Sequence, residues 1–170
     1  MSPTRPALAN IVALNDFEDN RWPTHNQESD KSEQTVDHFT TRNGVEFAGT
    51  HLMLDLWGAN QLNDLALMEA TMRKAVDVAG ATLLHIHLHH FTPNGGISGV
   101  AVLAESHISV HTWPERNFAA FDVFMCGDAQ PELTIPVLKE AFSPTNINVS
   151  EHLRGTSIAA NQSATKDHEQ

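Results

Sequence analysis

Apolar and polar side chains alternate over four successive segments between residues 81 and 127, and this period of two most limits how the chain can fold. Turn-forming residues separate the segments, among them Pro-Asn-Gly-Gly at 93–96 and Pro-Glu-Arg-Asn at 114–117. Such alternation is typical of strands with one buried face, and short turns favour antiparallel pairing. Four consecutive strands of a mainly antiparallel sheet are therefore predicted, at 81–91, 97–105, 107–113 and 118–127.

Two other segments predict helices. Residues 60–80 repeat leucine, methionine and valine at helical spacing, which is the pattern of a helix that packs on a core. Asn60 is expected to cap the start of this helix and Gly80 to end it. A second helix is expected within 131–142, with Pro136 either in its first turn or kinking it.

Two more strand-like segments, 50–58 and 146–155, complete the order of elements. The order strand, helix, four strands, helix, strand predicts an α+β fold, with a mainly antiparallel sheet and both helices packed on one face. Two helices cannot cover both faces of a sheet, so the second face is expected to need a partner.

Composition indicates which residues form the folded domain and which classes of partner are excluded. Residues 1–45 and 157–170 are polar and aperiodic, which predicts a disordered extension and a flexible tail around a domain at 46–156. The formal net charge of −11 argues against nucleic acid and anionic membranes as partners, because both favour a basic surface. The chain contains no run of 18 apolar residues, and its first twenty residues lack a signal-peptide pattern. We expect a cytoplasmic protein.

Three histidines on one predicted strand, His85, His87 and His89, raise the question of a metal site. Side chains two residues apart on a straight strand are separated by about 6.6–7 Å, so they converge poorly on one ion. No cysteine or carboxylate at a regular spacing completes a ligand set. We therefore predict no metal site here. The three histidines are expected to be structural or to face solvent, and the alternative is that His89 lines an active site.

The dipeptide Glu105-Ser106 permits a reaction of the chain with itself. A serine hydroxyl can attack the preceding carbonyl and form an ester, if the peptide is strained and donors hold the oxyanion. Removal of the Cα proton lets the ester eliminate, and hydrolysis leaves a pyruvoyl group, a ketone that forms a Schiff base with an amine and accepts electrons.

Ser106, His111 and Cys126 could supply the nucleophile, the base and a later proton donor for this chemistry. His111 follows Ser106 by five residues, so it reaches the serine only if the strand bends. Cys126 is the only cysteine, and a small buried apolar role is its alternative. From spacing alone, an ordinary serine in a strand remains the competing interpretation.

Five blocks of sequence, in order over 49–155, resemble the short pyruvoyl-dependent S-adenosylmethionine decarboxylase proenzymes of bacteria and archaea. The Glu-Ser-His block with His-Thr-Trp-Pro-Glu after it is the most specific. The blocks are GTHLMLDLWG at 49–58, HHFTPNGGISGV at 89–100, AESHISVHTWPE at 104–115, FAAFDVFMCG at 118–127 and VSEHLRG at 149–155.

The resemblance implies self-cleavage between Glu105 and Ser106, with Ser106 becoming the pyruvoyl cofactor and no metal. It implies roles in processing for His111 and Ser98, and protonation of the decarboxylated carbon by Cys126. A thiol is a reasonable acid here, because its ordinary pKa of about 8.5 lies near neutrality. The expected product, decarboxylated S-adenosylmethionine, is the aminopropyl donor for spermidine synthesis.

The resemblance also implies a substrate pocket and a dimer. Glu115 matches a glutamate that binds the substrate, expected at the ribose hydroxyls, and Phe91 matches a phenylalanine near the adenine; Trp113 is expected beside them. Members of this group form dimers whose active sites use both protomers. Such a dimer would pair the uncovered sheet faces into a layered α/β/β/α sandwich.

Two alternatives remain open. Some relatives decarboxylate arginine or ornithine, and this chain has an extra residue within 94–97 and an unusual segment at 116–120, both beside the expected pocket. Those substrates carry a second cation in place of adenine, whereas Phe91, Trp113 and Glu115 favour a nucleoside. The other alternative is an inactive relative that serves as a binding subunit, against which the joint presence of Ser106, His111 and Cys126 argues.

Overall fold

The computed structural model describes residues 39–156. The predicted tail 157–170 and most of the predicted extension 1–45 lie outside the described residues. At the start of the described part, β1 (Thr40–Arg42) and β2 (Val45–Phe47) form a small antiparallel hairpin that begins inside the segment assigned to the extension.

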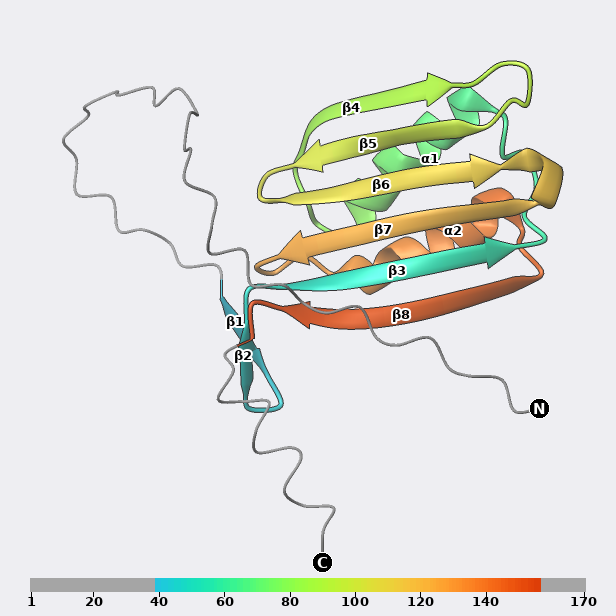
Figure 1. Cartoon of the computed structure of the whole chain (residues 1–170). Helices are drawn as coiled ribbons and strands as arrows, with labels where there is room; N and C mark the ends of the chain where they lie inside the picture. Colours follow the sequence, from blue (N-terminus) through green and yellow to red (C-terminus); the bar gives the residue numbers. More distant parts are fainter. Residues whose placement is uncertain (1–38, 157–170) are drawn as a thin grey trace, which may run out of the picture. The chain divides into compact units, whose positions relative to one another are not determined.

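A six-stranded sheet in the order β4-β5-β6-β7-β3-β8 carries the site, and all of its neighbouring strands are antiparallel (Figure 1). The four consecutive strands predicted from the alternation are neighbours in this sheet as β4 to β7, and β3 and β8 follow β7. The strands are β3 (Gly49–Trp57), β4 (Leu83–His90), β5 (Ile97–Leu103), β6 (Ser106–Trp113), β7 (Phe118–Cys126) and β8 (Asn146–Arg154).

Helices α1 (Leu65–Val78) and α2 (Thr134–Phe142) both lie behind the sheet in Figure 1, and short 3-10 turns precede β7 and α2 at Pro114–Arg116 and Pro131–Leu133. The predicted α+β class, with both helices on one face, is therefore confirmed. Neither helix of the described region is long and apolar enough to cross a membrane.

The core lies between this helix layer and one face of the sheet. Along β3, β6 and β7, more buried and less buried side chains alternate as the sequence predicts, because every second side chain points toward the helices. Burial of each large apolar side chain contributes roughly 1.5–3 kcal/mol to folding. The buried sheet residues include Leu52, Leu54 and Leu56 of β3, Ile108 and Val110 of β6, and Phe121, Val123 and Met125 of β7.

The start of α1 differs from the prediction. Asp64, not Asn60, caps the helix, and its side chain accepts a hydrogen bond from the Leu67 N–H. The preceding segment is held outside the helix because the Asn60 N–H donates to the Phe142 carbonyl and the Leu62 carbonyl accepts from Thr112. Tertiary hydrogen bonds thus override a capping residue that the local sequence favours.

The other predicted helix boundaries agree with the structure. Gly80 ends the first helix with a positive φ of 74°, a conformation that glycine adopts without steric cost. Pro136 is the third residue of α2, so it occupies the first turn rather than kinking the helix.

One strand differs from the predicted alternation. In β4, a bulge after Leu83 leaves Leu84 63% exposed, although the alternation predicts it on the apolar face.

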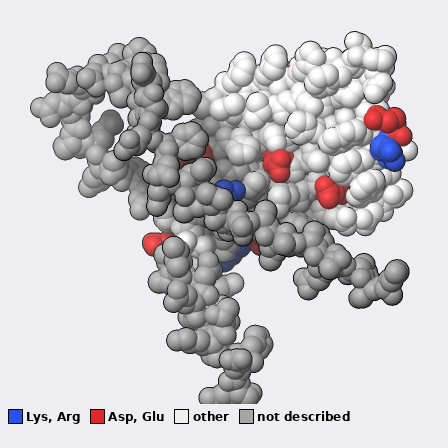
Figure 2. Space-filling model, viewed as in Figure 1, with Lys and Arg blue, Asp and Glu red and all other residues white. Residues whose placement is uncertain are grey.

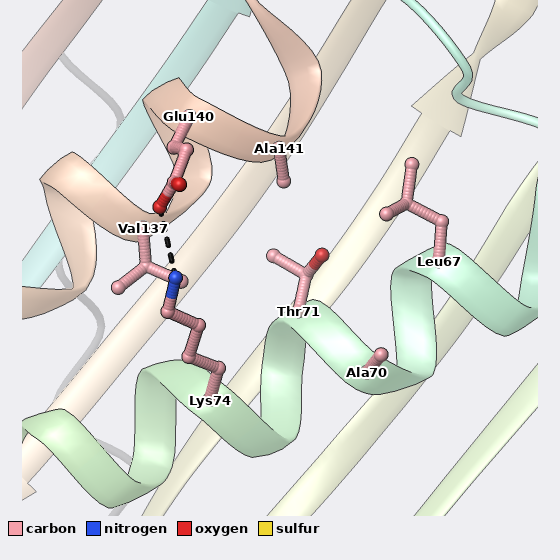
Figure 3. Close-up of a pocket in the computed structure, with 7 residues that line it drawn as sticks. All are labelled: Leu67, Ala70, Thr71, Lys74, Val137, Glu140 and Ala141. Atoms are coloured by element: carbon pink, nitrogen blue, oxygen red, sulfur yellow. Dashed lines mark hydrogen bonds and ion pairs between the residues drawn. The ribbon is translucent and has the colours of Figure 1, made fainter.

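A shallow groove runs between the two helices on their outer surface (Figure 3). Leu67, Thr71 and Val137 contribute to its lining, and Lys74 Nζ donates to Glu140 Oε2 at 2.8 Å across it. None of the site residues predicted from the sequence lines this groove.

No described helix packs on the second face of the sheet. Charged side chains are sparse on the part of this face that Figure 2 leaves visible. Met53, Trp57, Val102 and Trp113, whose strand positions turn them away from the helices, are 40%, 44%, 40% and 41% exposed. Large apolar side chains this exposed on one face are typical of a surface that another molecule covers.

Candidate active site

The Glu105-Ser106 bond lies in the tight turn that joins β5 to β6. Leu103 pairs with Ser106, so Ala104 and Glu105 alone form the turn. Glu105 has a φ of 63°, in the left-handed region that residues other than glycine enter at a cost. The backbone is therefore strained at the residue that precedes Ser106.

The Ser106 side chain is held beside Cys126 at the same end of the sheet. Ser106 Oγ accepts a hydrogen bond from the Cys126 backbone N–H at 3.2 Å. Both residues line a cavity of about 280 Å³, together with Glu105 and the loop at 80–82 that follows α1. The nucleophile, the strained peptide and the thiol predicted from the sequence thus share one cavity.

Burial raises the pKa of the half-buried Cys126 thiol, and the nearby Glu105 carboxylate raises it further. Both effects disfavour the thiolate, because an anion loses solvation on burial and is repelled by a second negative charge. The thiol therefore stays protonated at neutral pH, as a proton donor requires.

The second group of predicted residues lies at the opposite end of β6. Ser98 and His111 face each other across β5 and β6, with 2.9 Å between Ser98 Oγ and His111 Nδ1. They line a cavity of about 430 Å³ to which Phe91, Trp113 and Glu115 also contribute. The five side chains assigned to processing support and substrate binding are thus neighbours.

An aromatic row that the sequence did not reveal supports this cavity. Trp113, Phe118 and Trp57 are directly paired across β6, β7 and β3. Their rings stack at centroid distances of 5.3 Å for Trp113 with Phe118 and 4.3 Å for Phe118 with Trp57. Only the strand register brings these residues together, and the order β6-β7-β3 cannot be read from local sequence.

The two cavities are separated along the strand. β6 runs from Ser106 to Trp113 without interruption, so the bend that would bring His111 to Ser106 within one chain is not formed. Five residues of strand span roughly 16 Å. Alternation also turns His111 to the open face of the sheet, whereas Ser106 shares the parity of buried Ile108.

A row of polar side chains that the sequence pattern does not reveal crosses the open face between the two cavities. Ser109 Oγ donates to Asp122 Oδ2 at 3.1 Å, and Asp122 Oδ1 lies 3.6 Å from His51 Nε2. The Arg154 guanidinium lies 3.1 Å from His51 Nδ1 and donates to it. The pKa of His51 is lowered, mainly by burial; the Asp122 carboxylate raises this pKa, and the Arg154 guanidinium lowers it further.

The three histidines predicted on one strand face are spread along β4. His85, His87 and His89 lie on the edge strand and are exposed. Within residues 39–156, no three side chains of the metal-binding types gather at ligand distance. His89 instead contacts Phe91 edge to face, with ring centroids 4.5 Å apart, beside the cavity that Phe91 lines.

Comparisons with known proteins agree with these features. The family model described as S-adenosylmethionine decarboxylase matches residues 50–155. An S-adenosylmethionine decarboxylase proenzyme of Thermomicrobium roseum is 44% identical over 108 residues, covering 63% of this chain and 93% of the relative. One from Methanococcus vannielii is 46% identical over 110 residues, covering 63% and 89%.

A solved structure supports the same relationship. The crystal structure of the adenosylmethionine decarboxylase from Aquifex aeolicus matches with a TM-score of 0.58 and 32% sequence identity, covering 64% of this chain and 92% of that one. Residues 50–155, which the family model matches, include both cavities described above. The chain therefore belongs to the S-adenosylmethionine decarboxylase family.

Proposed function

We propose that this protein is a self-cleaving, pyruvoyl-dependent decarboxylase that converts S-adenosylmethionine to its decarboxylated form. The observation that carries the proposal is the strained Glu105 backbone directly before Ser106, with Ser106 Oγ held beside the only cysteine. In a family of decarboxylase proenzymes, this is the geometry that a peptide-to-ester rearrangement requires.

Self-cleavage begins with Ser106. Its Oγ attacks the Glu105 carbonyl carbon, the Ser106 nitrogen leaves, and the peptide becomes an ester with relief of the strain at Glu105. A base then removes the Ser106 Cα proton, the Cα–H electron pair forms the Cα=Cβ double bond, and the Cβ–Oγ bond breaks, which releases the main-chain carboxylate of Glu105 as the new C-terminus. The remaining enamine takes up a proton at Cβ and becomes an imine; water then adds at Cα and ammonia leaves, so that a ketone remains.

His111 is the base in this proposal, and Ser98 orients it. When His111 Nδ1–H donates to Ser98 Oγ, the lone pair is on Nε2, which is then free to accept a proton. Because His111 lies about 16 Å along β6 from Ser106 in its own chain, the His111 that serves each cleavage site comes from a second protomer. Two sheets packed face to face in antiparallel orientation bring the opposite ends of β6 together.

The pyruvoyl group, once formed, supplies an electrophilic ketone that binds the substrate amine and withdraws electrons as carbon dioxide leaves. Cys126 fits this group, because its thiol lines the same cavity as Ser106 and its raised pKa keeps the proton to be donated. The proton goes to the substrate carbon that lost carbon dioxide.

The second cavity holds the nucleoside. Phe91 and Trp113 offer aromatic faces to adenine and the sulfonium cation, and the Glu115 carboxylate accepts hydrogen bonds from two ribose hydroxyls. The names of the relatives favour S-adenosylmethionine over arginine or ornithine. Charge-assisted bonds contribute about 1.5–3 kcal/mol each, so Glu115→Gln should lower kcat/KM at least about tenfold.

The test combines mass and turnover. Purified protein should separate under denaturing conditions into chains 1–105 and 106–170, the second beginning with a pyruvoyl group, whereas Ser106→Ala stays intact. The cleaved protein should release carbon dioxide from S-adenosylmethionine and not from arginine or ornithine. An uncut wild-type chain would refute the mechanism, and release from arginine or ornithine alone would refute the pocket assignment.

A further inference from the structure

Thr112 is a buried polar residue that the proposed chemistry does not use. It is 7% exposed and lies in β6 between two residues of the second cavity, His111 and Trp113. Within the described residues, only two other polar side chains are as buried, Thr71 and Thr134. A buried hydroxyl costs free energy unless its hydrogen bonds are made, so its partners indicate what it holds in place.

The Thr112 hydroxyl connects three segments that are far apart in the sequence. Its Oγ1 donates to the Leu62 carbonyl at 3.0 Å and accepts from the Ile97 N–H at 2.7 Å. Leu62 belongs to the loop before α1, and Ile97 begins β5. The hydroxyl uses its donor and one acceptor position on these two backbone groups, and both bonds are buried.

The segment that Thr112 anchors is the loop that presents Phe91. This loop, 91–96, is closed by two backbone bonds of 2.8 Å, from the Phe91 N–H to the Gly96 carbonyl and from the Gly95 N–H to the Phe91 carbonyl. Its end is tied to β6 through Ile97, and Gly96 lies so close to β6 that a Cβ there would be 2.9 Å from the Thr112 carbonyl. The loop is therefore a closed unit docked onto β6 at Thr112.

The other partner of Thr112 supports the same loop from the side. A Cβ added at Gly95 would lie 3.2 Å from Asn63 Cβ, so the segment next to Leu62 packs against the loop 91–96. Thr112 thus holds both the loop and the segment beside it. Phe91 comes from the loop, whereas Trp113 and Glu115 come from the end of β6 and the turn after it.

We propose that Thr112 is a positioning residue that sets the distance between Phe91 and the Trp113–Glu115 side of the substrate cavity. The inference rests on the proposed function, since it takes this cavity to be the nucleoside site. Loss of the hydroxyl leaves the Ile97 N–H and the Leu62 carbonyl buried without this partner, and the loop moves to satisfy them. Binding then weakens, while the cavity of Ser106 and Cys126 is unaffected.

The experiment measures kinetics per cleaved chain, so that changes in processing do not enter. Thr112→Val keeps the shape and removes the hydroxyl; it should raise KM for S-adenosylmethionine about tenfold and change kcat less than about twofold, as expected when binding geometry is lost. Thr112→Ser keeps the hydroxyl and should restore the KM. Thr134→Val is the matched control, because Thr134 is equally buried but donates only to the nearby Pro131 carbonyl. It should leave KM unchanged.

The outcomes separate this inference from the proposed function. If Phe91→Ala and Glu115→Gln raise KM and Thr112→Val does not, the positioning role is wrong and the pocket stands. If none of the three raises KM, the pocket assignment fails, and the positioning role fails with it. A high KM in Thr112→Ser would show that the methyl group, not the hydroxyl, is required, and would also overturn the inference.

A second variant keeps the test decisive if Thr112→Val does not fold. Gly96→Ala places a methyl group against the Thr112 carbonyl and pushes the loop from the other side, with the hydroxyl intact. It should also raise KM with little change in kcat. A wild-type KM in this variant would show that the position of the loop does not control binding.

Discussion

At the scale of single residues, the Glu105 side chain of the strained turn also affects the acidity of Cys126. Burial and the Glu105 carboxylate both raise the pKa of the thiol. Glu105→Gln in the uncleaved Ser106→Ala background should therefore lower this pKa and increase the rate of alkylation near neutral pH. The measurement is the rate of iodoacetamide modification against pH, which reports one group because the chain has one cysteine. An unchanged profile would show that the Glu105 charge does not act on the thiol.

His111 and Ser98 are proposed to act after the ester has formed, in the elimination step, and this order can be tested. His111→Ala should stop at the ester, which hydroxylamine cleaves much faster than a peptide, giving chains 1–105 and 106–170. Ser98→Ala should slow the same step less, since it removes only the group that orients the ring. Mass spectrometry of the hydroxylamine products checks both; formation of the pyruvoyl group at the normal rate in His111→Ala would exclude His111 as the base.

At the scale of elements, the polar row across β6, β7, β3 and β8 makes the stability of the sheet depend on pH. The pKa of His51 is lowered in the folded protein, with burial as the main cause, Asp122 opposing, and Arg154, His107 and His152 contributing. Between the lowered pKa and the ordinary value of about 6.5, the unfolded chain binds more protons. The free energy of unfolding should therefore rise with pH through this window and fall as the solution is acidified.

His51→Gln tests this dependence, because glutamine stays neutral at every pH in the window. Urea denaturation of the uncleaved Ser106→Ala protein, with and without His51→Gln, should show a smaller loss of stability on acidification in the double variant. Using uncleaved protein keeps the unfolding reaction that of one chain. Equal slopes in the two proteins would mean that other histidines cause the dependence.

At the scale of the whole molecule, the distance between the two cavities predicts that cleavage needs a second protomer. When His111→Ala and Ser106→Ala chains are co-expressed with different tags, each mixed dimer of the proposed kind would have one complete site, with Ser106 from the first chain and His111 from the second. The His111→Ala chain should then be cleaved, and the Ser106→Ala chain should not. Mass spectrometry of the tagged chains distinguishes the two.

A matched control excludes a general stabilising effect of the partner. Replacing the Ser106→Ala partner by a Ser106→Ala, His111→Ala chain removes the only intact His111 and should abolish the cleavage. Cleavage that persists with this partner would show that His111 does not act across the interface. Cleavage in neither experiment would favour action of His111 within its own chain, through a rearrangement of β6.

Most of the secondary structure can be predicted from local sequence, because apolar side chains recur every two residues in a half-buried strand and about every 3.6 residues in a helix. The alternation in 81–127 predicts four strands, and the end of α1 at Gly80 follows from the freedom of glycine at positive φ. The Glu105-Ser106 dipeptide and the lone Cys126 were recognisable as candidates, because their reactivity belongs to the residue types themselves.

Only the tertiary structure decided which of these residues meet. Strand order and register place Cys126 beside Ser106 and stack Trp57 on Phe118, and a continuous β6 keeps His111 away from Ser106. The start of α1 at Leu65 and the buried bonds of Thr112 likewise depend on partners that are distant in the sequence, 15 and 50 residues away in the case of Thr112. Local sequence carries the period of each element, but pairing between distant strands depends on the packing of the whole sheet, and that packing determines the geometry of the site.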